Sequence, residues 1–100
     1  MAIQSAQIVP SETLALRREA GEWLRNRREE LGLSQTDLAK LVGAEYYSFI
    51  SQIENGRGKI PSNRFRDWAV SLRMEPKFFV QNILKYYDPH THAILFENEA

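Results

Sequence analysis

The chain has 100 residues, of which 43% are hydrophobic and 26% charged, a composition typical of a single soluble globular domain. It contains no cysteine, which excludes disulfides, thiol catalysis and cysteine-ligated zinc. Thirteen basic and thirteen acidic residues cancel, so the net charge alone argues against a nucleic-acid binder, which usually has a basic surplus.

Charge is distributed unevenly along the chain. Residues 1–66 contain ten basic and eight acidic residues, whereas residues 67–100 contain three and five. Four basic residues and no acidic one lie between positions 55 and 66, which predicts a local basic patch. Every apolar run is short and interrupted by charge, so neither a signal peptide nor a membrane-spanning segment is predicted, and a cytoplasmic protein is expected.

The first third of the chain predicts an arm followed by a long helix. Residues 1–10 carry no charged side chain, and we expect an N-terminal arm over residues 1–13, ahead of a domain over residues 14–87. Apolar residues mixed with arginine and glutamate favour a helix from about Ser11 to Leu31. Gly32 follows at the position where glycine commonly ends a helix.

The second helix has the clearest signals in the sequence. Ser34 and Asp37 form a predicted capping box, in which the two side chains satisfy free backbone amides at the helix start. Gly43 stands at the end of the helix, where a left-handed residue is favoured. Two helices joined by a short break, with a third after Gly43, predict a helix-turn-helix.

Residues 45–55 predict a third helix with one apolar and one polar face. At about 100° per residue, Tyr46, Ile50 and Ile53 fall on the inner side, and Ser48 and Gln52 point the opposite way. A glutamine amide can donate to and accept from adenine together, so the outer face suits base recognition. An ordinary solvated face is the alternative.

Glu54 falls near the inner side of this helix, where a carboxylate needs a partner because an unpaired buried charge is costly. Arg28, near the end of the first helix, is the best candidate. A bidentate pair between them is expected to hold the first helix against the third.

The remaining residues predict two further helices and a tail. The fourth helix has one apolar face, formed by Phe65, Trp68, Ala69 and Leu72. The fifth begins at Pro76 and continues to Tyr87, where Asp88-Pro89 is expected to stop it. His90 to Phe96 is expected to be a short strand or an extended arm.

The segments "LGLSQTDLAKLVG" and "SFISQIENGRGKIP" resemble the lambda-repressor-like helix-turn-helix family, also called Cro/C1-type or XRE-type. The specific part runs from Gly32 to Pro61, and the five-helix layout extends the likeness over roughly residues 14–87. The resemblance implies an all-α, five-helix domain with a short N-terminal arm and an extended C-terminal tail over residues 88–100.

The family's DNA-contacting positions fall on residues of the second and third helices and of the loop that follows them. The resemblance implies base contacts from Gln35, Tyr47, Ser48 and Gln52. It implies phosphate contacts from Asn55, Arg57 and Lys59, and Tyr46 is expected to contact a phosphate as well. The Arg–Glu pair of some members falls on Arg28 and Glu54.

The turn before the third helix is about one residue longer than the usual family spacing, so the two tyrosines are expected to differ. Tyr46 is expected to lie towards the core with its hydroxyl near the surface. Tyr47, at the edge of the helix start, is expected to reach a phosphate or a base. Phe49 replaces a residue that is commonly small and polar, and it is expected to pack or to touch a thymine methyl.

These observations together predict a transcriptional regulator that binds double-stranded DNA, in the simplest case a repressor that binds an inverted repeat as a homodimer. The fifth helix and the apolar segment Ala93–Phe96 are the expected dimer surface. The rival interpretation is a protein-interaction module or antitoxin of the same fold, which the zero net charge favours.

Catalysis has little support, and no cofactor is expected. Asp88, His90 and His92 stand at alternate positions and would share one face of a strand, where they could bind a metal. Such short patterns are more often turn and surface residues, and we predict no metal site.

Overall fold

The computed structural model describes residues 10–97, and all regular structure in this range is helical. The elements are α1 (Pro10–Glu30), α2 (Gln35–Val42), α3 (Tyr47–Glu54), a 3-10 helix (Ser62–Arg64), α4 (Phe65–Ser71), α5 (Pro76–Tyr87) and α6 (Pro89–Phe96). The predicted all-α fold is therefore confirmed. No helix within these residues is long and apolar enough to cross a membrane.

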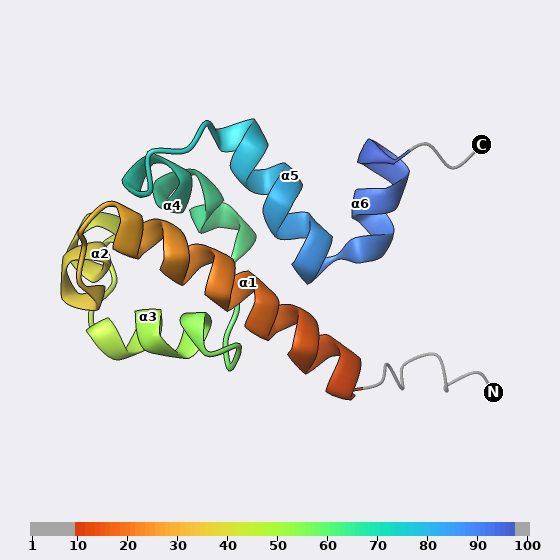
Figure 1. The fold of residues 1–100 in the computed structure, drawn as a ribbon. Coiled ribbons are helices and arrows are strands. Elements are labelled where there is room, and N and C mark those ends of the chain that lie inside the picture. The colour runs from red at the N-terminus through yellow and green to blue at the C-terminus, as the bar shows by residue number, and fades with distance from the viewer. Residues whose placement is uncertain (1–9, 98–100) are drawn as a thin grey trace.

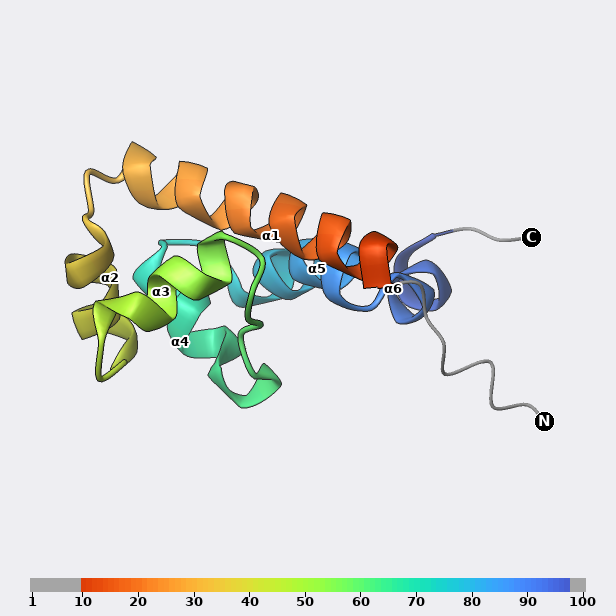
Figure 2. The ribbon, with the colours of Figure 1, turned by 90° about the horizontal axis from the view of Figure 1, so that it is seen from below.

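The long helix α1 organises the molecule (Figure 1, Figure 2). α1 packs against both α3 and α5, while α2 packs against α3 and α4. α2 and α3 lie at one end of the molecule, and α6 stands beside α5 at the other (Figure 1). The helix-turn-helix is thus held on one side by α1 and on the other by α4.

A single apolar core fills the space between these helices. Its largest fully buried side chains are Trp68 of α4 and Phe79 of α5. The other buried apolar residues come from α1 to α5, the loop after α3 and the C-cap of α4: Ala20, Leu24, Leu38, Ala39, Val42, Ile50, Ile53, Ile60, Ala69, Leu72 and Ile83. Burial of this apolar surface is the main favourable contribution to folding.

The signals that delimit α2 are present as predicted. Ser34 is the N-cap, its hydroxyl accepts from the Asp37 amide at 2.9 Å, and the Asp37 carboxylate accepts from the Ser34 amide at 2.9 Å. These hydrogen bonds lower the pKa of Asp37, with the backbone amide of Ser34 the largest cause. Gly43 ends the helix with φ 74°, in the left-handed region.

The prediction of an extended C-terminal segment was wrong, because Pro89–Phe96 forms α6. The Asp88 side chain accepts from the Thr91 amide and caps this helix, and Pro89 occupies its first turn. Asp-Pro ends one helix and is also a favourable start for another. As a stop signal alone, Asp88-Pro89 predicts an extended segment, whereas as a cap and first turn it begins α6.

The first helix begins close to the position predicted for it. α1 starts at Pro10, one residue before the expected start at Ser11, so the last four residues of the arm predicted over residues 1–13 are helical. Proline is well suited to the first turn of a helix, since its missing amide would have no partner there. The rest of the predicted arm, residues 1–9, lies outside the described residues.

α1 and α3 cross with their backbones in close contact at Gly21. A Cβ atom built on Gly21 would lie 2.1 Å from the carbonyl oxygen of Glu54 and 2.8 Å from that of Ile53. Both obstacles are backbone atoms, which a side-chain rotation cannot move. Glycine is therefore required where α1 passes the C-terminal end of α3.

We predict that Gly21→Ala destabilises the protein although alanine is the better helix former. The higher helix propensity of alanine is worth about 1 kcal/mol, but the overlap with Glu54 must be relieved by shifting α1 away from α3. We expect a net loss of about 1–3 kcal/mol in the free energy of unfolding, measured by urea denaturation. Gly58→Ala is the matched control, because its Cβ would meet nothing closer than Ile53 Cγ1 at 3.7 Å. Equal stability of the two variants would contradict the steric explanation.

Candidate nucleic-acid interface

A buried ion pair fixes α3 to the end of α1. Arg28 Nε donates to Glu54 Oε2 at 2.6 Å, and Arg28 Nη2 donates to Glu54 Oε1 at 3.0 Å. The two residues are 7% and 4% exposed. Hydrogen bonding to Glu54 raises the pKa of Arg28 above its ordinary value. The bidentate pair expected from the sequence is present, and it sets the position of α3 relative to α1.

The same pair also reaches α2. Arg28 Nη1 donates to the Leu33 carbonyl at 2.7 Å, just before the cap of α2. Gln35 Nε2 donates to Glu54 Oε1 at 3.0 Å. The amide nitrogen of Gln35, a residue predicted to contact a base, is thus bound to the ion pair, and this hydrogen bond links the start of α2 to the end of α3.

α3 has a buried face and an exposed face, as its sequence predicts. Ile50 and Ile53 are 0% and 1% exposed and pack in the core, on the same side as Glu54. Tyr47, Ser48 and Gln52, the other predicted base-contacting residues, have exposed side chains. These three residues form what we call the outer face of α3.

Tyr46 does not lie towards the core, contrary to expectation. It is the N-cap of α3, with extended backbone angles of φ −132° and ψ 144°, and its side chain is 66% exposed. The helical wheel placed Tyr46 inside because it assumed that the helix began at Glu45. A residue in the extended N-cap conformation does not follow the 100° period, so its side chain is free of the buried face.

The loop after α3 holds the three remaining predicted phosphate-binding residues, Asn55, Arg57 and Lys59, all with exposed side chains. The Arg57 amide donates to the Gln52 carbonyl at 2.8 Å, which folds the loop back onto α3. Lys59 Nζ lies 5.2 Å from the centre of the Tyr87 ring, within range of a cation–π interaction. The loop therefore begins beside the C-terminal end of α3 at Arg57, and the Lys59 ammonium lies over α5.

α1 adds a further basic residue, Arg18, beside this loop. A Cβ built on Gly56, which has φ 80°, would lie 2.9 Å from Arg18 Cγ, so the exposed Arg18 lies directly against the loop. Arg18 and Gly56 are 38 positions apart, and only the crossing of α1 over the end of α3 brings them together. No local sequence pattern signals this contact.

The other basic residues of the patch have different roles. Arg64 Nη2 donates to the Val42 carbonyl at the C-terminal end of α2, and Arg64 Nε lies 3.4 Å from Asp67 Oδ2. Arg64 is thus a helix-capping residue in this structure. Arg66 is exposed on α4.

The three residues weighed as metal ligands do not form a site. α6 is a helix, so the shared strand face on which that possibility depended is absent. Asp88 caps α6, and the buried His92 pairs through Nδ1 with Glu97 Oε2 at 3.1 Å. Within residues 10–97, no group of three or more potential ligands is arranged to hold a metal ion.

Comparison with known proteins identifies two similarities. A family model described as helix-turn-helix matches residues 24–78, which is more than half of the chain and includes all of α2, α3 and α4. An uncharacterized HTH-type transcriptional regulator of Sinorhizobium fredii is 28% identical over 64 residues, covering 64% of this chain and 44% of the relative. The chain therefore spans less than half the length of that curated relative.

We predict that Glu54→Gln lowers stability far more than the loss of a surface ion pair. The variant keeps the shape of the side chain but removes the buried counter-charge of Arg28, leaving only the exposed Glu29 carboxylate at 3.9 Å, at an expected cost of about 3 kcal/mol in the free energy of unfolding. Glu30→Gln is the control, since Glu30 pairs with Arg27 at 3.2 Å and its side chain is 66% exposed. The control is expected to change stability by roughly 0.5 kcal/mol or less. Urea denaturation of both variants measures the difference, and similar losses would contradict the prediction.

Proposed function

The chain belongs to the Cro/C1-type helix-turn-helix family of DNA-binding transcriptional regulators, and from this premise we propose that it is a repressor that binds an inverted-repeat operator as a dimer. The observation that carries the proposal is the outer face of α3. Its side chains are exposed while the opposite face is anchored by the Arg28–Glu54 pair. A helix presented in this way suits the major groove.

The outer face supplies the groups for reading bases. Gln52 offers an amide that can pair with adenine through one donor and one acceptor, and Ser48 offers a hydroxyl one turn earlier. Tyr47, in the first turn, is placed to reach a base or a phosphate. Gln35 contributes indirectly, by holding Glu54 and thereby α3, and can approach DNA through its carbonyl oxygen.

Phosphate contacts are assigned to the loop after α3 and its neighbours. Asn55, Arg57 and Lys59 offer one amide and two positive charges, and Arg18 adds a third charge from α1. Tyr46, exposed at the opposite end of α3, can donate its hydroxyl to a phosphate. Two sets of contacts at the two ends of α3 would fix its register along the groove.

The dimer is assigned to α6 and the adjoining part of α5. Ile94, Leu95 and Phe96 are 76%, 60% and 42% exposed, so three consecutive apolar side chains of α6 face solvent. α6 lies at the end of the molecule away from α2 and α3 (Figure 1), which leaves the outer face of α3 free in a dimer. Occlusion of a promoter by such a dimer is the simplest form of repression.

A protein-interaction module is the second candidate, and one observation favours it. The net charge is zero, whereas DNA binding draws much of its affinity from positive charge. In that case the exposed apolar residues of α6 would bind another protein, and contact with DNA would be incidental.

Selection of the purified protein against random duplex DNA is expected to enrich an inverted repeat with half-sites one helical turn apart. Gln52→Ala should then weaken binding to the selected site by about 1–3 kcal/mol and relax the preference at one base pair, because one bidentate contact is lost. Asn26→Ala, which removes an exposed amide from α1, is the control and should bind like the parent. Absence of any enriched sequence, with binding lost at physiological salt, would favour the interaction module.

The salt dependence of binding separates phosphate contacts from base contacts. Lys59→Ala should weaken binding to all sequences alike and reduce the slope of log affinity against log salt by about 1, because one fewer counterion is released. Gln52→Ala should leave this slope unchanged. An unchanged slope for Lys59→Ala would remove that residue from the phosphate contacts.

The proposed dimer is tested by sedimentation velocity at micromolar concentration, with and without DNA. Leu95→Lys places a charge on the proposed interface and should yield a monomer. Leu41→Lys is the matched control, because Leu41 is 56% exposed on α2, at the other end of the molecule. A parent protein that is monomeric under both conditions would refute the dimer.

A further inference from the structure

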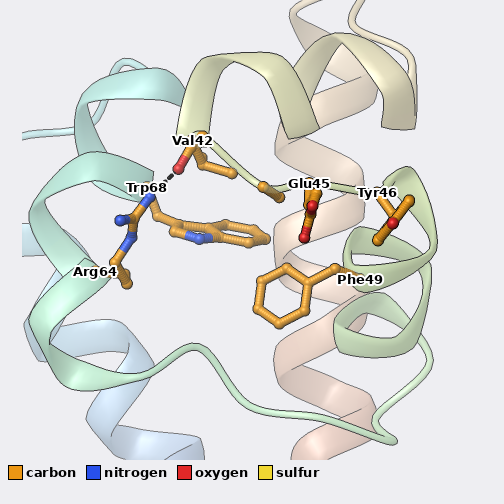
Figure 3. A pocket seen from close by; sticks show the side chains of 8 residues that line it. Val42, Glu45, Tyr46, Phe49, Arg64 and Trp68 are labelled. Carbon is orange, nitrogen blue, oxygen red and sulfur yellow. Dashed lines mark hydrogen bonds between the residues drawn. The ribbon is translucent and has the colours of Figure 1, made fainter.

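A cavity of about 350 Å³ lies beside the start of α3. It is open to solvent and is bordered by the end of α2, the turn into α3, the first turn of α3 and the segment from Arg64 to Trp68 (Figure 3). The lining residues are Val42, Gly43, Ala44, Glu45, Tyr46, Phe49, Arg64 and Trp68. This volume is at the lower end of the range for small-molecule sites.

Three of the eight residues that line the cavity are aromatic. Trp68 is almost fully buried and forms the floor, whereas Phe49 and Tyr46 are 39% and 66% exposed and lie nearer the opening. In Figure 3 the ring of Phe49 and the indole of Trp68 border the same space. Aromatic rings attract both apolar groups and organic cations, because the ring face carries partial negative charge.

The two charged residues of the cavity differ in whether another group of the protein already pairs with their charge. The Arg64 guanidinium is engaged by the Val42 carbonyl, as Figure 3 shows, and by Asp67. The Glu45 carboxylate forms no ion pair with any of residues 10–97. Figure 3 shows it between the indole of Trp68 and the ring of Tyr46, above Phe49. The negative charge is therefore the one left to interact with a ligand.

We propose that this cavity binds a small organic cation. The apolar or aromatic part of the ligand lies on Phe49 and above Trp68, and its ammonium group faces the Glu45 carboxylate and the Tyr46 ring. Glu45 supplies the charge selection, and the aromatic walls supply the binding of the apolar part.

Because the cavity lies beside the start of α3, a bound ligand could affect the DNA binding proposed above. Tyr46 is the N-cap of α3 and Phe49 lies in its first turn, so a ligand that contacts both holds the turn between α2 and α3 in one position. Binding that depends on this position would be coupled to DNA binding, and the coupling would be reciprocal. This consequence rests on the proposed function, whereas the binding site itself does not.

The site is tested by NMR titration of the full-length, ¹⁵N-labelled protein with three probes of similar size. 2-Phenylethylammonium is the cation, 2-phenylethanol is the uncharged analogue and 3-phenylpropanoate is the anion. We expect saturable shifts of the Ala44 and Phe49 amides and of the Trp68 indole N–H with the cation. The uncharged probe should bind about fivefold more weakly, which corresponds to the loss of one partly solvated charge interaction, and the anion more weakly still.

Two variants assign the charge selection to one residue. Glu45→Gln keeps the side-chain shape and should bind the cation about fivefold more weakly, with little change for 2-phenylethanol. Glu22→Gln alters an exposed carboxylate of α1 that does not line the cavity, and should bind all three probes like the parent. The amide spectra of both variants show directly whether the fold is retained.

Three outcomes would overturn the proposal: no saturable shift with the cation, shifts centred on residues outside the cavity, or tighter binding of the anion, which would assign charge selection to Arg64. A separate titration of the selected operator, with and without 2-phenylethylammonium, tests the coupling. Failure to bind any DNA would refute the proposed function and leave the NMR result unaffected. Unchanged operator affinity beside saturable NMR shifts would refute the coupling alone.

Discussion

The Arg28–Glu54 pair is the interaction on which the arrangement of the helix-turn-helix depends. One guanidinium is bound by the carboxylate at the end of α3 and by the Leu33 carbonyl before α2, and the same carboxylate accepts from Gln35 at the start of α2. A short helix such as α3 has little stability of its own and takes its position from tertiary contacts. Four hydrogen bonds around one carboxylate and one guanidinium hold α1, α2 and α3 in position relative to one another. Because the pair is buried, it tolerates little change in this geometry.

Features that depend on residues close together in the sequence could be predicted from it. The Ser34–Asp37 box, the left-handed Gly43 and the apolar face of α4 each depend on neighbours within one or two turns. The inward carboxylate at Glu54 could also be paired with Arg28, because a buried charge demands a partner. Base and phosphate contacts were transferred by resemblance, and their exposure on α3 and its loop is compatible with those roles.

Features that depend on backbone conformation or on the crossing of helices could not be predicted from the sequence. The prediction that Tyr46 lies towards the core was wrong because a helical wheel does not show where the helix begins. The sequence did not predict α6 because Asp-Pro can either end or start a helix. Arg18 lies against the loop after α3 only because α1 crosses that helix. The cavity beside α3 arises in the same way, since Phe49 and Trp68 meet across two helices that are not adjacent in sequence.

The absence of a side chain at Gly21 has a consequence for how the proposed DNA sequence preference can be changed. The backbone contact there, together with the ion pair, fixes α3 entirely through its inner side and its C-terminal end. Tyr47, Ser48 and Gln52 take no part in that support, so they can be exchanged with only small effects on folding. On this eight-residue helix, the residues proposed for recognition are separate from those that support stability. The scaffold is therefore suited to reprogramming, in which new operators are selected by randomising the outer positions alone.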